Sequence, residues 1–231
     1  MKRERPLKIA IKIGRYAFPS KLDFEVVSAY AEVFKKLRSE GHRLVVVTGG
    51  GEDARKYIDA ARKLGGSELV CDLMGIQVSR LNARLLISRL GEDAYPEPPT
   101  SVEELRKAFE TGKIVVLGGL QPGQSTNAVA AISAESIEAD LLINATDVDG
   151  VYTADPKRDP NAKKLDEIDA DELLRKILSE ELWAGGYELF DPVAIKIVKR
   201  SRIPTRIVDG RNVGNIERVV KGEKLGTLIL V

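Results

Sequence analysis

Apolar residues are gathered into short continuous runs along the chain, and segments with helical periodicity lie between these runs. Continuous runs rich in Val, Ile and Leu predict strands that are buried on both faces, which are typical of parallel sheets. Strands that alternate with helices predict an α/β fold, with roughly six to eight mostly parallel strands and helices on both faces. We expect strands at residues 7–13, 44–47, 113–117, 141–145, 205–208 and 227–231.

The segments between the strands carry helix start and stop signals. Asp23 precedes an apolar stripe that ends before Gly41, and Asp191 is followed by Pro192. Asp is a favoured N-cap, Pro is favoured at the first helical position, and Gly often follows the last turn of a helix. We expect helices at residues 23–40, 52–64, 72–90, 127–138, 169–180 and 212–221, with two further helices that start after Ser101 and Asp191.

Three of the expected strands end at glycine, at Gly14, Gly49 and Gly118. After the second strand, Gly49, Gly50 and Gly51 lead directly into a helix. Residues without a Cβ let a ligand approach the backbone, and the first N–H groups of the helix favour an anion such as phosphate. A tight strand-to-helix connection would explain one of these glycines well but three poorly. A glycine-rich turn by itself remains a weak motif.

Two later turns carry polar groups that suit a phosphorylated ligand. Residues 118–126 form a loop with three glycines and two glutamines, and Ser125 and Thr126 end it before a helix of small residues. The two hydroxyls can cap that helix or bind a phosphate together with its N–H groups. The turn after the fourth strand holds Asp147 and Asp149, which could ligate Mg²⁺ or serve as ordinary turn residues. The spacing does not decide between these two roles.

Composition argues against several classes of function. The chain has 231 residues, a formal net charge of +1 and scattered basic residues, so we expect no nucleic-acid partner. Cys71 is the only cysteine and His42 the only histidine, which excludes an intrachain disulfide and a Cys/His zinc site. No run approaches the ~20 apolar residues of a membrane helix, and the N-terminus lacks a signal-peptide core. We therefore expect a cytoplasmic protein without a membrane partner, and we interpret residues 1–231 as a single domain.

Several turns with features that suit a phosphate lie on one sheet edge. Together with a nearby lysine, they indicate phosphoryl transfer. Lys12 lies at the carboxyl end of the first strand, the edge where ligands bind in open α/β sheets. Phosphoryl transfer needs positioning and positive charge more than it needs a covalent nucleophile. The GxxxxGK[ST] motif of P-loop kinases is absent from the sequence. We therefore expect a kinase of another fold family.

Five segments resemble the amino acid kinase family, and within it the archaeal-type UMP kinases. These segments are VTGGGEDARKYI at 47–58, DLMGIQVSRLNA at 72–83, GGLQPGQSTNAVAA at 118–131, ATDVDGVYTADP at 145–156 and YELFDPVAIKIV at 187–198. They occur in the family's order and span most of the chain, so the resemblance is more specific than a shared fold. It implies a three-layer αβα sandwich around a mostly parallel central sheet, usually assembled as a homo-hexamer. It also implies transfer of the ATP γ-phosphoryl group, with Mg²⁺, to UMP in pyrimidine nucleotide biosynthesis.

The resemblance also implies roles for individual residues. Lys12 would be the catalytic cation, and no side chain of the protein is assigned as a metal ligand. The N-terminal part of the domain would form mainly the acceptor site and the C-terminal part mainly the ATP site. The residues implied at the ATP site are Gly14, Arg15, Gly51, Arg55, Thr146, Tyr152 and Asp155. The residues implied at the UMP site are Gly50, Asp72, Leu120, Gln121, Pro122, Gly123, Gln124, Ser125 and Thr126.

Some positions depart from the family pattern or have a second explanation. The sequence alone favours Asp72 as a helix N-cap, and only the resemblance implies that it binds the UMP ribose. The first loop reads Lys12-Ile13-Gly14-Arg15-Tyr16, where the family usually has two adjacent small residues, so Arg15 could itself reach the phosphates. Asn127 stands where many relatives have an aspartate that organises the catalytic lysine. Either another carboxylate such as Asp191 orients the lysine, or the geometry of the site does so.

Two other functions stay open beside this interpretation. Another kinase of the same fold, acting on carbamate, an amino acid or an isopentenyl phosphate, would keep the ATP half and differ at residues 118–126. A non-catalytic nucleotide-binding or oxyanion-storage relative would bind nucleotide without turnover. Fast ADP formation with UMP would exclude the non-catalytic class.

Overall fold

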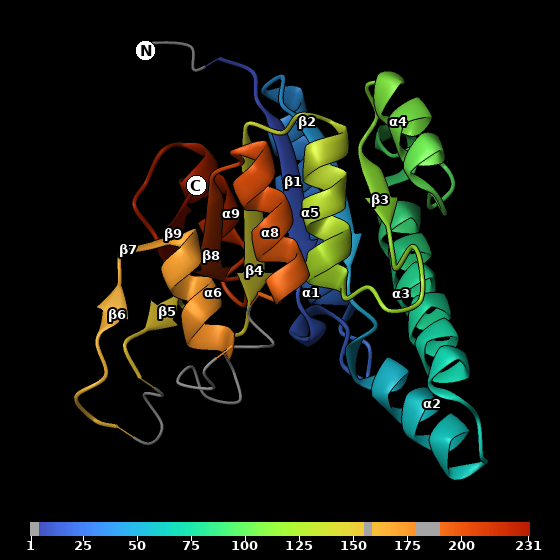
Figure 1. Cartoon of the computed structure of the whole chain (residues 1–231). Coiled ribbons are helices and arrows are strands. Elements are labelled where there is room, and N and C mark those ends of the chain that lie inside the picture. The colour runs from blue at the N-terminus through green and yellow to red at the C-terminus, as the bar shows by residue number, and fades with distance from the viewer. Residues whose placement is uncertain (1–4, 155–158, 179–189) are drawn as a thin grey trace.

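The described part of the chain forms a central sheet with helices on both faces (Figure 1). The computed structural model describes residues 5–154, 159–178 and 190–231. Within these residues the sheet has seven strands in the order β3-β2-β1-β4-β8-β9-β7. The strands are β1 (Lys8–Ile13), β2 (Arg43–Thr48), β3 (Val115–Leu117), β4 (Leu141–Thr146), β7 (Glu167–Asp169), β8 (Thr205–Asp209) and β9 (Thr227–Leu230). All neighbours are parallel except β8 and β9, which confirms the expected mostly parallel sheet.

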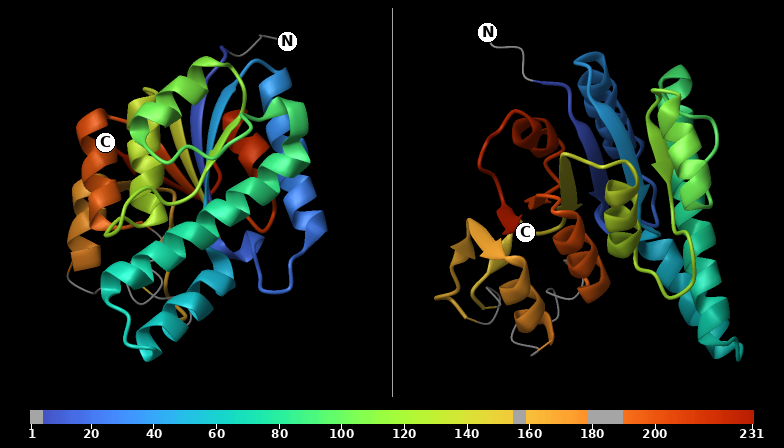
Figure 2. Two further views of the ribbon diagram at one scale, coloured as in Figure 1. Left: turned by 90° about the vertical axis from the view of Figure 1, so that its right-hand side faces the viewer. Right: turned by 45° about the horizontal axis from the view of Figure 1, so that its top comes forward.

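The helices make the sheet the middle of three layers, as Figures 1 and 2 show. They are α1 (Phe24–Ser39), α2 (Gly51–Lys63), α3 (Glu68–Leu90), α4 (Val102–Glu110), α5 (Thr126–Ser136), α6 (Ala170–Leu178), α8 (Pro192–Ser201) and α9 (Gly214–Val220). One buried cluster joins one face of the sheet to α4, α5, α6 and α8, and a second joins the other face to α1, α3 and α9. Alternate residues of β1 belong to the two clusters, with Ala10 in the first and Ile9 and Ile11 in the second. The predicted αβα sandwich is confirmed.

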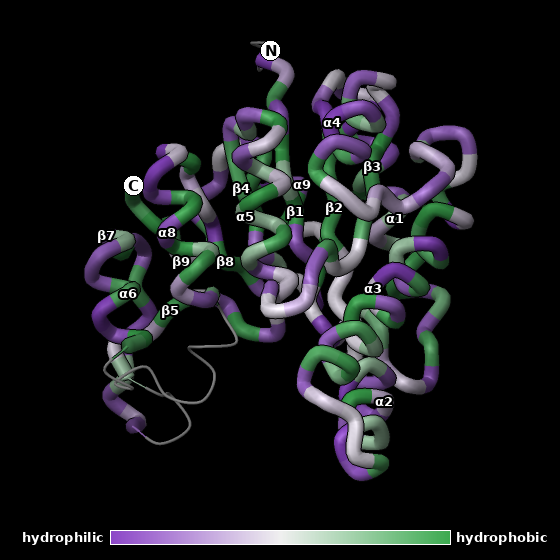
Figure 3. The backbone as a smooth tube through the Cα atoms, turned by 45° about the vertical axis from the view of Figure 1, so that its right-hand side comes forward, coloured by the Kyte–Doolittle hydropathy of each residue, from purple (hydrophilic) through white to green (hydrophobic). Residues whose placement is uncertain are grey.

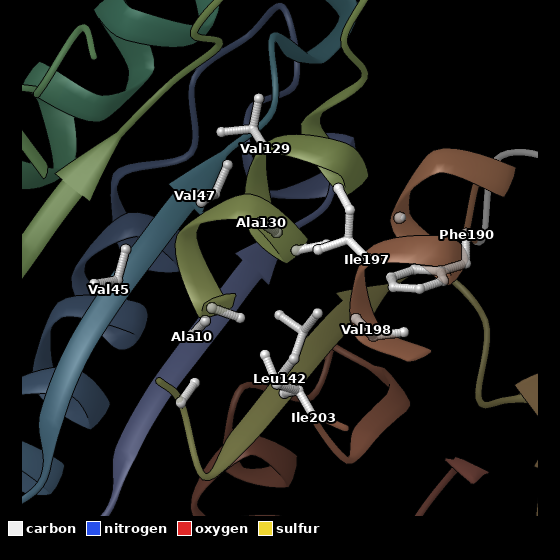
Figure 4. Packing of buried hydrophobic residues seen from close by; sticks show 14 of the residues in the cluster. Ala10, Val45, Val47, Val129, Ala130, Leu142, Phe190, Ile197, Val198 and Ile203 are labelled. Atoms are coloured by element: carbon white, nitrogen blue, oxygen red, sulfur yellow. The ribbon is translucent and has the colours of Figure 1, made fainter. Parts of the chain in front are cut away.

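Small residues bring α5 close to the sheet. Ala130, Ala131 and Ala134 are buried on this helix. Figure 4 shows Val129 of the same helix beside Val47 of β2. Because these side chains are short, the first turn of α5 lies close to the carboxyl edge of the sheet.

β1 lies between β2 and β4, where the direction of strand addition reverses. The chain first adds β2 and β3 on one side of β1, and later adds β4 and β8 on the other side. In open α/β sheets, ligands bind outside the carboxyl ends of the strands at such a point. The register places Lys12 between Val47 and Asn144 at this edge.

The structure corrects one predicted helix boundary. We expected a helix at 72–90, but α3 begins at Glu68, and its N-cap is Ser67, whose hydroxyl accepts a hydrogen bond from the N–H of Val70. Asp72 therefore lies inside the helix, and its interpretation as an N-cap is wrong. The predicted N-caps that the structure confirms are Asp23, Ser101 and Asp191.

Some short strands were not predicted. β5 (Val151–Tyr152) and β6 (Lys164–Leu165) form a separate antiparallel pair, and β7 lies at one edge of the main sheet. Segments of two or three residues are too short to show a recognisable alternation of apolar and polar positions.

α2 and α3 extend beyond the end of the sheet (Figures 1 and 2). α3 is apolar on more than its buried side, and Figure 3 shows hydrophobic positions along much of its length. Leu73 and Met74 are exposed on α3, and the Leu81 side chain is 65% exposed. No helix in the described ranges is both long enough and apolar enough to span a membrane.

Phe34 tests the packing of α1 on the sheet. Its side chain is fully buried, whereas Phe24 at the start of the same helix is 71% exposed. We expect Phe34→Ala to lower the free energy of unfolding by about 3–5 kcal/mol, because it removes buried contacts and leaves a cavity. Phe24→Ala should change that free energy by less than about 0.5 kcal/mol. Urea unfolding measures both values, and equal losses would contradict the described core.

Candidate functional site

A cavity of about 310 Å³ opens at the carboxyl edge of the sheet, where β1, β2 and β4 end. The starts of α2, α5 and α8 complete its walls. The predicted site residues that line it are Lys12, Gly14, Arg15, Gly50, Gly51, Arg55, Ser125, Thr126 and Thr146. The lining also includes Gly49, Ala54, Asn127, Asp147 and Asp191, and of these only Ala54 had not been singled out from the sequence.

Lys12 supplies a nearly buried positive charge to this cavity. Its residue exposure is 7%, and it shares a face of β1 with Ala10, on the side that α5 covers. Burying an ammonium group costs free energy unless negative groups face it. The N-terminal ends of the surrounding helices add positive potential, because their backbone dipoles point this way. The cavity therefore suits an anionic ligand such as a chain of phosphates.

Asp191 joins the first turns of α8 and α5. Its Oδ1 accepts hydrogen bonds from the N–H groups of Val193 (2.9 Å) and Ala194 (3.0 Å), so it caps α8. Its Oδ2 accepts a hydrogen bond from the Ser125 hydroxyl. The Ser125 oxygen in turn accepts from the N–H of Ala128 (3.0 Å) and caps α5. This buried carboxylate therefore has a structural role in holding two helix starts side by side.

Arg15 and Asp147, which also line the first cavity, form an ion pair. An Arg15 guanidinium nitrogen donates to Asp147 Oδ2 at 3.1 Å, and both side chains are partly exposed. Burial acts to raise the pKa of Asp147, but the charge and hydrogen bond of Arg15 outweigh it and lower that pKa. Asp147 therefore stays ionised at neutral pH. No cluster of three or more potential metal ligands occurs in the described ranges.

A pair of tyrosines anchors the turn that carries Arg15. Tyr30 of α1 donates from its hydroxyl to the carbonyl of Gly210 (2.7 Å), and the Tyr16 hydroxyl is hydrogen-bonded to that of Tyr30. Burial raises the pKa of both phenols above the ordinary value for tyrosine. Tyr16 therefore ties the loop after β1 to α1 and, through Tyr30, to the end of β8.

Packing explains why one residue of the turn after β2, Gly51, is a glycine. Gly51 has φ +69°, and a Cβ there would lie 2.2 Å from the carbonyl oxygen of Phe18. A Cβ at Gly49 would make only an ordinary contact, with its nearest atom, the Ile13 oxygen, at 3.6 Å. Gly51 is thus required by the fold itself, beyond any need for a ligand to approach the backbone.

A second cavity, of about 220 Å³, adjoins the first and lies between α3 and the loop at residues 118–126. The two cavities share Gly50, Ala54 and Thr126. The predicted residues that line the second cavity are Gly50, Asp72, Gln121, Gln124 and Thr126. Its lining includes further residues that sequence reasoning missed, namely Ala54, Ile58, Gly75, Ile76, Ser79 and Gly119.

The remaining predicted residues lie elsewhere. Leu120 is buried in the core, and Ser125 lines the first cavity only. Pro122 and Gly123 are exposed on the loop. The Tyr152 hydroxyl donates to Asp149 (2.8 Å) outside both cavity linings. Asp155 lies outside the described residues.

Comparison with known proteins identifies the family of the chain. Residues 8–209 match the Amino acid kinase family. This chain belongs to the amino acid kinase family. It is 53% identical to the uridylate kinase of Hyperthermus butylicus, over 96% of this chain and 97% of that protein. It is 47% identical to the uridylate kinase of Methanothermobacter thermautotrophicus, over 97% and 99% of the two chains.

Solved structures of the family superpose on almost the whole chain. The crystal structure of uridylate kinase from Archaeoglobus fulgidus matches with a TM-score of 0.86 and 39% identity, over 96% of this chain and 100% of that one. The UMP kinase of Bacillus anthracis matches with a TM-score of 0.82 at 21% identity, over 98% and 97% of the two chains. The second match shows a shared fold.

The tyrosine pair predicts a loss of stability in alkali. Because the pKa of Tyr16 is raised in the folded state, unfolding releases its proton once the pH exceeds about 10, and stability falls as pH rises further. Tyr16→Phe should flatten this fall by up to about 1.4 kcal/mol per pH unit. Urea unfolding between pH 9 and 11 measures the slopes. Near pH 8 the two proteins should show the same pH dependence, and equal slopes at pH 10–11 would refute the assignment.

Proposed function

We propose that this chain is a UMP kinase that transfers the γ-phosphoryl group of ATP to UMP and forms ADP and UDP. The observation that carries the proposal is the pair of adjoining cavities that share Gly50, Ala54 and Thr126. Direct transfer between two nucleotides needs two sites whose phosphate ends meet. The uridylate kinase relatives, which match over nearly their whole length, supply the acceptor and the reaction.

The first cavity would hold the ATP phosphates. Gly14, Gly51 and the N–H groups at the start of α2 would face them, with Arg15 and Arg55 adding positive charge. Thr146, which lines this cavity, would face the nucleoside end of ATP. The proposal assigns Tyr152 and Asp155 to the same end of ATP, as the family resemblance implies. Mg²⁺ would arrive bound to the ATP phosphates, an arrangement that needs only one or two carboxylates from a protein. The ionised Asp147 carboxylate in the lining fits this need.

Lys12 would stabilise the phosphoryl group while it is transferred from ATP to UMP. Lys12 lines the first cavity, which adjoins the second at Gly50, Ala54 and Thr126. In phosphoryl transfer, negative charge is spread over the oxygens of the transferred group, and a fixed cation stabilises it. The UMP phosphate would itself attack, so no covalent enzyme intermediate is needed.

The second cavity would hold UMP, with its phosphate at the shared wall. Thr126 would offer its hydroxyl and the first N–H groups of α5 to the phosphate. Asp72 would accept hydrogen bonds from the ribose, and the loop at 120–126 would enclose the base. The Gln124 side-chain oxygen is buried without a hydrogen-bond partner among the described residues, so it could accept a bond from the ligand.

The biological setting is part of the same proposal. A UMP kinase would act in pyrimidine nucleotide biosynthesis, in the cytoplasm, as one domain with the acceptor site mainly in its N-terminal part. We propose a homo-hexamer, the assembly that the family resemblance implies, and the exposed apolar residues of α3 support a protein partner at that helix. Light scattering tests the assembly, and a monomer in solution would contradict it.

A coupled assay of ADP formation with UMP, CMP, dUMP and uridine tests the function. Turnover with UMP far above the other acceptors supports the proposal. Turnover with carbamate, an amino acid or an isopentenyl phosphate in place of UMP would favour another kinase of this fold. Nucleotide binding without turnover would favour a non-catalytic relative.

Lys12→Ala should lower kcat by about 10²-fold or more, with little change in UMP affinity. The reason is that the lysine stabilises negative charge on the phosphoryl group in the transition state. Lys8→Ala is a matched control, because Lys8 lies on the same strand and pairs with Glu138 (3.5 Å) at the other end. The control should retain kcat within about twofold. Steady-state kinetics measures kcat for both variants. A normal kcat in Lys12→Ala would show that Lys12 does not act in the transfer step.

Thr126→Ala tests the site of the acceptor phosphate. Loss of one hydrogen bond to a charged group costs roughly 1.5 to 3 kcal/mol, so UMP should bind about ten- to a hundredfold more weakly. Uridine has no phosphate, and its weak binding should stay almost unchanged. Calorimetric titration of both ligands measures this, and equal losses would mean that Thr126 only supports the loop.

A further inference from the structure

Helix α3 holds both chain segments that enclose the second cavity. Asn82 Nδ2 donates to the carbonyl of Gly49 (2.9 Å), at the start of the glycine turn. One turn earlier, Ser79 Oγ accepts a hydrogen bond from the N–H of Gly119 (2.7 Å). Both side chains are buried. The two walls of the acceptor cavity are therefore fixed to the same helix.

Arg80 holds the carbonyl groups of the same loop. Its Nε donates to the carbonyl of Gly119 (2.9 Å), and a terminal nitrogen donates to the carbonyl of Leu120 (3.1 Å). A guanidinium carries its donors in a rigid planar fork, so it fixes the relative orientation of two successive carbonyls. Gly119 is thus held at its N–H and at its carbonyl by adjacent residues of α3.

The far end of the loop returns to the same helix. The N–H of Gly123 donates to Asp72 Oδ2 at 2.7 Å. Asp72 precedes Arg80 by about two helical turns, or ~12 Å. The loop therefore lies along α3 between two tethers, and Gln121 and Gln124 line the second cavity.

We infer that Arg80 is a positioning residue for the acceptor nucleotide, and this inference rests on the proposed function of the second cavity. Arg80 is absent from the lining of either cavity, so it acts through the loop. The start of the loop has little room to adjust, because a Cβ at Gly118 would lie 2.5 Å from the backbone nitrogen of Arg80. Without the guanidinium, the segment that reaches Gln121 and Gln124 loses its fixed direction.

Arg80→Met tests the inference. UMP affinity should fall about ten- to a hundredfold, because two charge-assisted hydrogen bonds to the loop are lost. The KM for UMP should rise by the same factor, while the KM for ATP and kcat at saturating UMP should change less than about twofold. Arg80→Lys keeps the charge and can satisfy one carbonyl, so its UMP affinity should lie between those of wild type and Arg80→Met.

Arg84→Met is the matched control, because Arg84 lies one turn further on α3 and pairs with Glu97 (2.7 Å) at the surface. It should bind UMP like wild type. Calorimetry with UMP alone, kinetics with both substrates and thermal melting are measured on all four proteins. A lower melting temperature with unchanged UMP affinity would make Arg80 purely structural and overturn the inference, as would equal losses for UMP and ATP.

Two further outcomes separate the inference from the function on which it rests. If Arg80→Met does not fold, Arg80→Lys decides, and an unchanged UMP affinity in it overturns the positioning role. A wild-type protein that binds no UMP would overturn the proposed function and this inference with it. Normal UMP binding by wild type and by both Arg80 variants would overturn the positioning role alone.

Discussion

The site is organised around a positive charge buried at the end of a central strand. Lys12 sits in β1 between two parallel neighbours, so its position is fixed by backbone pairing on both sides. The helix starts around it increase the positive potential. Positive potential at this edge of the sheet favours an anionic ligand there.

Two carboxylates, Asp147 and Asp191, line the first cavity together with Lys12. Asp191 is committed to the starts of α8 and α5, and Asp147 is paired with Arg15. The sequence singles out Asp191 as a carboxylate that could orient Lys12 in place of an aspartate at position 127. Its hydrogen bonds show that it aligns the starts of α8 and α5, and it lines the same cavity as Lys12.

The strand pattern and the glycine turns were enough to predict the sheet, its layers and the edge that carries the cavities. Lys12 could be placed there because a strand end is a local feature of the sequence. The contacts of Asp72, Ser79 and Arg80 with the loop could not be predicted, because they join segments about 40 to 50 residues apart. The start of α3 was missed because Ser67 precedes a segment without a clear amphipathic pattern, whereas Asp72 resembles a cap.

The tyrosine pair also links two positions that are far apart in the chain. A Cβ at Gly210 would lie 1.9 Å from the hydroxyl oxygen of Tyr16, so the ring at 16 occupies the space that a side chain at 210 would need. A small residue at position 16 would remove this contact, and the Cβ of Ala145 would then be the nearest atom, at 2.8 Å. The two positions should therefore covary as the family diverges, with a bulky aromatic residue at 16 accompanied by glycine at 210.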